Sequence, residues 1–307
     1  MRVLIIGGNG FIGSHLTRFL VDQDQEVKVY SRSQNIYCPP IPNVTYVMGD
    51  LADQVLIASA LKDIDIVYQL MSGTIPSTSN QNPTDDVNSN VINTLKLLQA
   101  CVDASIQKVI FASSGGTVYG IPRSIPIAED HPTNPICSYG ITKLMIEKYL
   151  SLFHYLYGLD YTILRIANPY GSYQNPTGKI GVITIFLNQI MQNQPLKIWG
   201  NGETVRDYLY VSDVIQALYR AQTHGLPEKL FNIGSGKGTS LNLLLDKMRI
   251  VIRQDFKVEY ASSRVVDVPT NVLDISRAER IMGWQPRVPM EDGLQKTWQW
   301  LQQISMT

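Results

Sequence analysis

Short apolar runs alternate with amphipathic stretches through the first half of the chain. Residues 3–6 predict a buried strand, and the apolar positions over 11–21 recur at helical spacing. By the same reading we expect further strands at 26–30, 44–48, 65–70, 108–112 and 160–166, and helices at 53–61, 85–104 and 138–157. Strands that alternate with helices specify a parallel sheet with helices on both faces. The predicted fold is therefore a doubly wound α/β fold of the Rossmann type.

The pattern changes after Asn168. Turns become frequent, short strands and helices mix, and residues 230–233 again read as a buried strand. We expect a dinucleotide-binding domain over 1–167, to which a strand and helix near 210–234 return. Residues 168–307 then form a smaller, mixed substrate lobe over the carboxyl edge of the sheet, where ligands of such folds bind.

Three glycines follow the first predicted strand at the spacing G-x-x-G-x-x-G. Gly7 allows a sharp turn, Gly10 lets the backbone approach a pyrophosphate, and Gly13 lets the next helix pack on the strand. The free N–H groups at the start of that helix, near Phe11 and Ile12, favour phosphate. Because the triplet lies between a strand and a helix, it predicts a dinucleotide site rather than a packing turn.

Composition disfavours several kinds of binding partner. The 307 residues carry 26 basic and 26 acidic side chains and no basic block, which disfavours a nucleic-acid partner. The three cysteines and four histidines show no metal-ligand spacing, so we expect no metal and a reduced, cytoplasmic setting. We expect neither a signal peptide nor a membrane span, since no apolar run approaches the ~20 residues that a span needs.

Tyr139 and Lys143 are the candidate chemical pair. Their i, i+4 spacing puts both side chains on one face of the predicted helix 138–157. The ordinary pKa of tyrosine, about 10, is too high for a base at neutral pH. We expect the Lys143 ammonium to lower the pKa of Tyr139, so that the phenol can exchange a proton with a sugar hydroxyl.

The chain resembles the extended short-chain dehydrogenase/reductase family, in its nucleotide-sugar epimerase branch near UDP-glucose 4-epimerase. The resemblance covers essentially the whole length. Its motifs are G-G-N-G-F-I-G at 7–13, G-D-L at 49–51, S-S-G-G-T-V-Y-G at 113–120, Y-G-I-T-K at 139–143, R-I-A-N-P-Y-G at 165–171, G-N-G-E-T-V-R-D-Y-L-Y-V-S-D at 200–213 and R-V-V-D-V-P at 264–269.

The resemblance implies roles for individual residues. Tyr139 would be the acid/base, and Lys143 would bind the nicotinamide ribose. Asn168 would contact the sugar nucleotide, and Arg206 and Arg264 would clamp its diphosphate, which suits the bidentate guanidinium. For these two arginines, ion pairs with Asp207 and Asp267 are the alternative. The implied cofactor site comprises Gly7, Gly10, Phe11, Ile12, Gly13, Ser31, Arg32, Asp50, Leu51, Leu70, Tyr139 and Lys143.

The chain departs from this branch of the family at the position four residues before the tyrosine of V-Y-G. A serine or threonine is usual there, but this chain has Gly115. Ser114 or Thr117 could bond the reacting sugar oxygen instead, and the sequence does not choose between them. No carboxylate stands at 116–117, which disfavours a 4,6-dehydratase.

Two further departures concern specificity. NAD-binding proteins place an acid at the end of the second strand, but this chain has Ser31 followed by Arg32, which could pair with the 2′-phosphate of NADP. NAD and NADP both stay open here. Asn271 aligns with the position, often tyrosine, that limits sugar size, and a smaller residue could admit an N-acetyl sugar.

Two enzyme functions follow from the resemblance. The first is a nucleotide-sugar 4-epimerase that uses tightly held NAD and a transient 4-keto sugar. The second is an NADPH-dependent reductase of a nucleotide-4-keto-sugar. A non-catalytic dinucleotide sensor is disfavoured because the Tyr–Lys pair is retained. The family also implies a homodimer through the helices 85–104 and 138–157.

Overall fold

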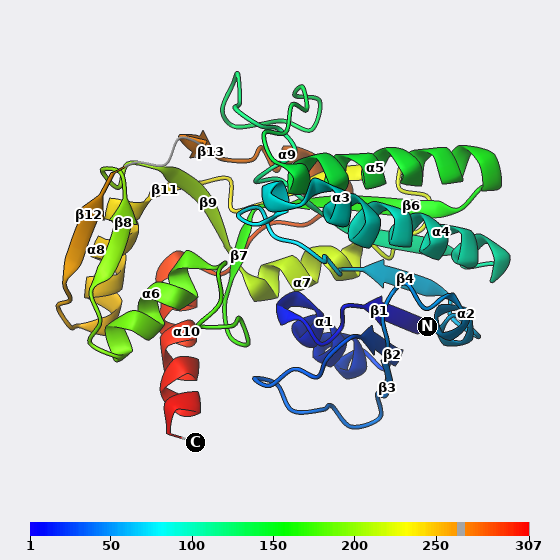
Figure 1. Ribbon diagram of the computed structural model, residues 1–307, viewed down its shortest axis with the longest axis horizontal. Helices are drawn as coiled ribbons and strands as arrows, with labels where there is room; N and C mark the ends of the chain where they lie inside the picture. Colours follow the sequence, from blue (N-terminus) through cyan, green and yellow to red (C-terminus); the bar gives the residue numbers. More distant parts are fainter. Residues whose placement is uncertain (263–267, 307) are drawn as a thin grey trace.

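The computed structural model describes residues 1–262 and 268–306 of the chain. Its centre is a seven-stranded parallel sheet with the order β10-β6-β5-β4-β1-β2-β3 (Figure 1). The strands are β1 (Arg2–Ile6), β2 (Glu26–Ser31), β3 (Thr45–Met48), β4 (Ile66–Gln69), β5 (Lys108–Ser114), β6 (Asp160–Ile166) and β10 (Leu230–Ile233). The strand order reverses between β1 and β4, which makes that edge the expected ligand crevice.

Alternation along β1 explains why helices cover both faces of the sheet. Val3 and Ile5 pack in one apolar cluster, and Leu4 and Ile6 pack in the other. Helices α1 (Phe11–Asp22) and α7 (Val211–Arg220) cover the first face, whereas α2 (Gln54–Ala60), α4 (Asn93–Asp103) and α5 (Ser138–Tyr157) cover the second (Figure 1). The predicted Rossmann-type fold is confirmed.

The predicted helix 85–104 is not one uniform α-helix. It is divided into α3 (Pro83–Asp86), the π-helical segment η2 (Val87–Ile92) and α4, and a short 3₁₀ turn η1 (Ser79–Gln81) precedes it. The Oγ of Ser89 donates to the carbonyl of Asp85 at 2.6 Å, and Nδ2 of Asn90 donates to that of Asp86 at 3.0 Å. Side chains that bond the i−4 carbonyl compete with the backbone ladder, which accounts for the widened turn.

The described part of the second lobe contains two small sheets, which lie to the left of the centre of Figure 1. One sheet joins β11, β9 and β13 with β7, and the other joins β8 with β12. The elements are β7 (Asn168–Tyr170), α6 (Val182–Met191), β8 (Leu196–Trp199), β9 (Val205–Tyr210), β11 (Gly238–Ser240), α8 (Leu241–Ile252), β12 (Val258–Ala261), β13 (Thr270–Asn271), α9 (Ser276–Met282) and α10 (Met290–Ser305). The division at 167/168 stays a prediction, since one apolar cluster runs through both lobes.

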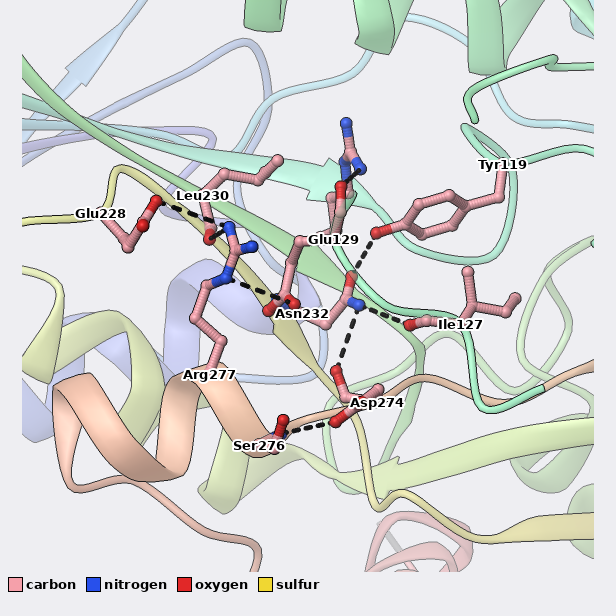
Figure 2. A network of polar contacts seen from close by, with 10 residues as sticks. Tyr119, Ile127, Glu129, Glu228, Leu230, Asn232, Asp274, Ser276 and Arg277 are labelled. Carbon is pink, nitrogen blue, oxygen red and sulfur yellow. Dashed lines mark hydrogen bonds and ion pairs between the residues drawn. The ribbon is translucent and has the colours of Figure 1, made fainter. Parts of the chain in front are cut away.

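A buried polar network connects segments that are distant in sequence (Figure 2). The backbone N–H of Asn232 on β10 donates to Oε1 of Glu129 at 2.9 Å, and its Nδ2 donates to the carbonyl of Ile127 at 2.8 Å. The Tyr119 hydroxyl donates to Oδ1 of Asn232 at 2.6 Å, and Arg277 of α9 lies 3.5 Å from Glu129. These contacts fix the loop after β5 against the return strand.

A second buried pair joins α5 to the sheet. Nη2 of Arg165 on β6 donates to Oε2 of Glu147 at 2.6 Å, and its Nε donates to Oε1 at 3.0 Å. The Ser113 hydroxyl also donates to Glu147, at 2.5 Å. Both charged side chains are 4% exposed, so each provides the counter-ion that the other needs in the interior.

We predict that Glu147→Gln lowers the free energy of unfolding by about 3 kcal/mol, because it leaves the Arg165 charge buried without a counter-ion. Chemical denaturation measures this. Glu259→Gln, the same change at an exposed position of β12, should stay within about 0.5 kcal/mol of the parent protein. Equal stabilities of the two variants would contradict the assigned role of the pair.

Candidate active site

A cleft of about 1380 Å³ opens at the carboxyl edge of the seven-stranded sheet and continues onto the second lobe. It brings together most of the residues that the sequence selects. Those lining it are Gly7, Gly10, Phe11, Ile12, Gly13, Ser31, Arg32, Leu70, Ser114, Thr117, Tyr139, Asn168 and Arg206. Asp50, Leu51, Lys143 and Asn271 do not line it, and Arg264 lies outside the described residues.

The glycine loop meets the geometric needs of a dinucleotide. Gly7 has a φ of 83°, which favours glycine, and its N–H donates to the carbonyl of Tyr30 at 2.8 Å. A Cβ on Gly13 would lie 2.4 Å from the carbonyl oxygen of Gly7, so only glycine lets α1 pack this closely. A Cβ on Gly10 would meet only that oxygen, at 3.1 Å, and a longer side chain would extend into the cleft.

The N-terminus of α1 is suited to a phosphate. No side chain caps it, and no acidic residue lies in its first turn. Phe11 and Ile12 line the cleft at this point. Uncapped N–H groups at the positive end of a helix dipole favour an anion, so the residues present fit the pyrophosphate of a dinucleotide.

Tyr139 and Lys143 lie on the first turns of α5, as the spacing predicts. The backbone N–H of Tyr139 donates to Oγ of Ser79 at 3.1 Å. Nζ of Lys143 donates to the carbonyl of Ala112 at 2.8 Å and lies 5.6 Å from the centre of the Tyr139 ring. Tyr139 thus lines the cleft, while Lys143 lies behind it, 4% exposed.

Burial dominates the ionisation of this pair. It raises the pKa of Tyr139 above its ordinary value, and the neighbouring Cys137 and Asp86 raise it further. It also lowers the pKa of Lys143 to about 8, against the opposing pull of Glu147 and Asp86. The net pKa of Tyr139 is therefore raised in the protein alone and not lowered as expected, because the cost of burying a phenolate prevails.

The space beside Gly115 explains why no serine stands there. A Cβ on Gly115 would lie 2.6 Å from Cδ1 of Leu273 and 3.0 Å from the carbonyl oxygen of Arg165. Ser114 and Thr117 both line the cleft instead. Oγ1 of Thr117 is buried and has no hydrogen-bond partner among residues 1–262 and 268–306. An unpaired buried hydroxyl is costly, which makes Thr117 the better placed of the two to bond a ligand.

The residues predicted to choose the dinucleotide are engaged within the protein. Oγ of Ser31 accepts from the backbone N–H of Asn9 at 3.0 Å and so holds the glycine loop. Nη1 of Arg32 lies 4.0 Å from Oδ2 of Asp50, and both side chains are more than half exposed. The Leu51 side chain is wholly buried in the apolar cluster. Leu51 does not line the cleft, so its contact with a cofactor stays a prediction.

The predicted substrate residues of the second lobe meet on β7, β9 and β13. Nδ2 of Asn168 donates to the carbonyl of Asp207 at 3.0 Å, and Nη1 of Arg206 donates to that of Val268 at 2.7 Å. The buried Asp207 carboxylate accepts from the backbone N–H of Ser235 at 2.6 Å. Asn271 is 1% exposed and donates to the carbonyl of Gly115 at 3.1 Å, which fixes β13 against the loop after β5.

The sequence reading missed several residues near the site. Lys197, Trp199, Thr204 and Tyr208 line the cleft from the second lobe, where no strand or helix pattern is strong enough to place them. The polar stretch after β4 also supplies Ser72, Thr74 and Asn80 to the lining. Within the described ranges, no group of His, Cys, Asp or Glu is arranged to hold a metal. In the same ranges, no helix combines the length and apolarity that crossing a membrane requires.

Comparison with known families decides the classification. The model of the NAD dependent epimerase/dehydratase family matches residues 3–234. The chain belongs to this family. Its members are NAD-dependent enzymes, which confirms the predicted enzyme class and NAD as cofactor.

Individual relatives and one solved structure are similar to this chain over nearly its whole length. The chain is 35% identical to a putative UDP-glucose 4-epimerase of Methanocaldococcus jannaschii, over 99% of this chain and 100% of that protein. It is 33% identical to a dTDP-4-dehydro-6-deoxyglucose reductase of Escherichia coli, over 96% and 95%. A structure of Thermotoga maritima UDP-glucose 4-epimerase with UDP-glucose aligns with a TM-score of 0.93 at 34% identity, over 99% of this chain and 100% of that one.

Proposed function

We propose that the chain is a nucleotide-sugar 4-epimerase that acts on a UDP-sugar such as UDP-glucose or UDP-N-acetylglucosamine. One observation carries the proposal. A single cleft joins the glycine loop to Tyr139 and continues to Asn168 and Arg206. A dinucleotide and a sugar nucleotide can therefore meet at one proton-exchanging group. The similarity to UDP-glucose 4-epimerases over the full length supports this reading.

Each residue of the proposed site has a physical task. Gly7, Gly10 and Gly13 with the start of α1 would hold the pyrophosphate of NAD, which when bound supplies a hydride acceptor and donor. Arg206 would bind the substrate diphosphate, together with Arg264 from outside the described residues. Asn168 would contact the sugar nucleotide.

Tyr139 would exchange the proton of the C4 hydroxyl. Burial keeps its phenol protonated in the protein alone, which suits donation to a 4-keto oxygen. Removal of the C4 proton needs the phenolate, and Lys143 is the cation on the same helix face that favours it. The Thr117 hydroxyl, or that of Ser114, would bond the reacting oxygen and hold it near Tyr139.

The proposed reaction passes through a 4-keto sugar that must present both faces to the cofactor. A cleft of about 1380 Å³ leaves room for that rotation while the diphosphate stays bound. Asn271 stands at the position that limits sugar size in the family, and its side chain is buried against Gly115. That arrangement supports a site open to an N-acetyl sugar.

A reductase of nucleotide-4-keto-sugars is the second candidate. Ser31 and Arg32 favour it, since they place no carboxylate at the end of β2 and a cation beside it. The similarity to the dTDP-4-dehydro-6-deoxyglucose reductase also supports it. The Arg32–Asp50 contact weakens it, because Asp50 repels a 2′-phosphate that would pair with Arg32.

We also propose a homodimer formed through the outer faces of η2 and α5. Apolar side chains remain exposed there, among them Ile92, Ile141, Leu152 and Leu156. Two copies of this face would cover them. We further infer a cytoplasmic setting, which the three free cysteines Cys38, Cys101 and Cys137 support.

The cofactor content separates the two candidate reactions. We predict that the purified protein releases about one equivalent of NAD per chain on acid treatment and converts UDP-glucose or UDP-N-acetylglucosamine to the 4-epimer without added cofactor. An epimerase returns the hydride it takes, so the cofactor is not consumed. Protein that purifies empty and oxidises NADPH with a 4-keto sugar would contradict the proposal and favour the reductase.

The role of Tyr139 has its own test. We predict that Tyr139→Phe lowers kcat by at least about 10²-fold, because general acid–base catalysis contributes roughly that much, and that it still binds NAD. Tyr155→Phe makes the same change on α5 at a side chain that is 85% exposed, and it should leave kcat unaltered. Near-normal turnover by Tyr139→Phe would remove the phenol from the mechanism.

The dimer is tested by charge. We predict that Leu152→Asp combined with Leu156→Asp yields a monomer in analytical ultracentrifugation, since two carboxylates would be buried at the interface. Ile250→Asp on α8, 72% exposed, should leave the parent's dimeric mass unchanged. A dimer that persists in the double variant would place the interface elsewhere.

A further inference from the structure

Asp86 is a buried carboxylate to which neither the motifs nor the proposed chemistry gives a role. It ends α3 and is 0% exposed. Its Oδ2 accepts from the Ser138 hydroxyl at 2.5 Å and from that of Thr142 at 3.5 Å. Its Oδ1 accepts from Nδ2 of Asn90 at 2.7 Å and from the Thr74 hydroxyl. All four donors are neutral, so no cation cancels the charge of the carboxylate in this contact shell.

These contacts surround the first turn of α5. Ser138 begins the helix and Thr142 follows one turn later, with Tyr139 between them. Thr74 belongs to the loop after β4 and lines the cleft. One side chain therefore joins the start of the helix that carries Tyr139 and Lys143 to the loop that faces the ligand.

The α5 terminus depends on this neighbouring segment. Its own N-cap residue, Cys137, provides no side-chain cap. Its first N–H groups are satisfied from η1, because Ser138 donates to Oδ1 of Asn80 at 2.8 Å and Tyr139 donates to Oγ of Ser79. The position of Tyr139 is thus set by tertiary contacts with residues 79–86, and not by the helix alone.

We propose that Asp86 is a positioning residue of the active site: it anchors the first turn of α5 against the loop after β4 that lines the cleft, and it places a carboxylate beside the helix turn that carries Tyr139 and Lys143. The inference rests on the proposed function, in which those two side chains exchange the substrate proton.

The surroundings support an electrostatic effect of Asp86. Its carboxylate raises the pKa of Tyr139 and of Lys143. The other titratable groups that act on this pair are Cys137, beside Tyr139, and Glu147, beside Lys143 and paired with Arg165.

Other charged groups on the elements packed against α5 lie further from the pair or in solvent. Lys108 and Asp160 begin β5 and β6, at the opposite edge of the sheet. Asp85, Lys96 and Asp103 are exposed. Asp86 is therefore the carboxylate in contact with the first turn of α5 through which the pair can be tuned.

The test uses the NAD-loaded protein and Asp86→Asn, which keeps the shape of the side chain, removes its charge and replaces one of the two accepting oxygens with an NH2 group. Because the carboxylate raises both pKa values, its removal lowers both. We expect both the ascending and the descending limb of the kcat–pH profile to move to lower pH. Asp85→Asn, the same change at the exposed neighbour, should leave the profile in place.

A second readout does not depend on turnover. Carbon-13 NMR of labelled tyrosine, assigned through Tyr139→Phe, should report ionisation of Tyr139 at lower pH in Asp86→Asn than in the parent protein. If the protein lacks epimerase activity but this titration moves, the proposed function fails and the role of Asp86 stands. An unmoved titration overturns the role of Asp86, whatever the activity.

Ser138→Ala separates anchoring from charge. It removes one hydrogen-bond donor to Asp86 and leaves the carboxylate in place. The kcat should therefore fall several-fold, while the KM and both limbs of the kcat–pH profile stay unchanged. The same variant keeps the proposal falsifiable if Asp86→Asn does not fold. A kcat equal to that of the parent would contradict the anchoring role.

Discussion

The packing of Tyr139, half-buried in the wall of the cleft, and of Lys143, buried behind it, is the constraint on which the rest of the site depends. Burial makes both ionised forms costly, so it raises the pKa of the phenol and lowers that of the ammonium to about 8. A pair held in this way responds strongly to any nearby charge. Two carboxylates act on it: Asp86, which contacts the first turn of α5, and Glu147 of the same helix, which is paired with Arg165.

The fold keeps that pair in place by contacts that cross between layers. Glu147 and Arg165 join α5 to β6, and the network of Glu129, Asn232 and Arg277 fixes the loop after β5 to the return strand (Figure 2). The two lobes share one apolar cluster, so the cleft between glycine loop and β9 has a continuous base. In the proposed reaction, substrate recognition and proton exchange would therefore depend on the same buried framework.

Much of this arrangement could be predicted because it depends on short patterns in the sequence. Short apolar runs predicted the strands of the sheet, and the spacing of Gly7, Gly10 and Gly13 predicted the dinucleotide loop. The i, i+4 spacing placed Tyr139 and Lys143 on one helix face. The family resemblance then located Asn168 and Arg206 at the cleft that the structure contains.

What could not be predicted depends on side-chain contacts, some of them local and others between residues that are distant in sequence. The π-helical turn arises where the side chains of Ser89 and Asn90 donate hydrogen bonds to backbone carbonyls one turn earlier. Leu273 fills the space that the side chain of a serine at position 115 would need. The direction of the Tyr139 pKa was missed because a sequence gives the neighbouring lysine but not the depth of burial. Asp86 belongs to no recognised motif. Its role is suggested only by its hydrogen bonds to α5 and to the loop after β4 that lines the cleft.

The central claim is that hydrogen leaves C4 of the sugar and returns to the same carbon within one cleft. The most direct measurement follows UDP-glucose deuterated at C4, incubated with the purified protein without added cofactor. The account predicts UDP-galactose that retains the deuterium at C4, with none released to solvent. Product that has lost the deuterium, or an absence of epimerised product with UDP-glucose and UDP-N-acetylglucosamine alike, would contradict it.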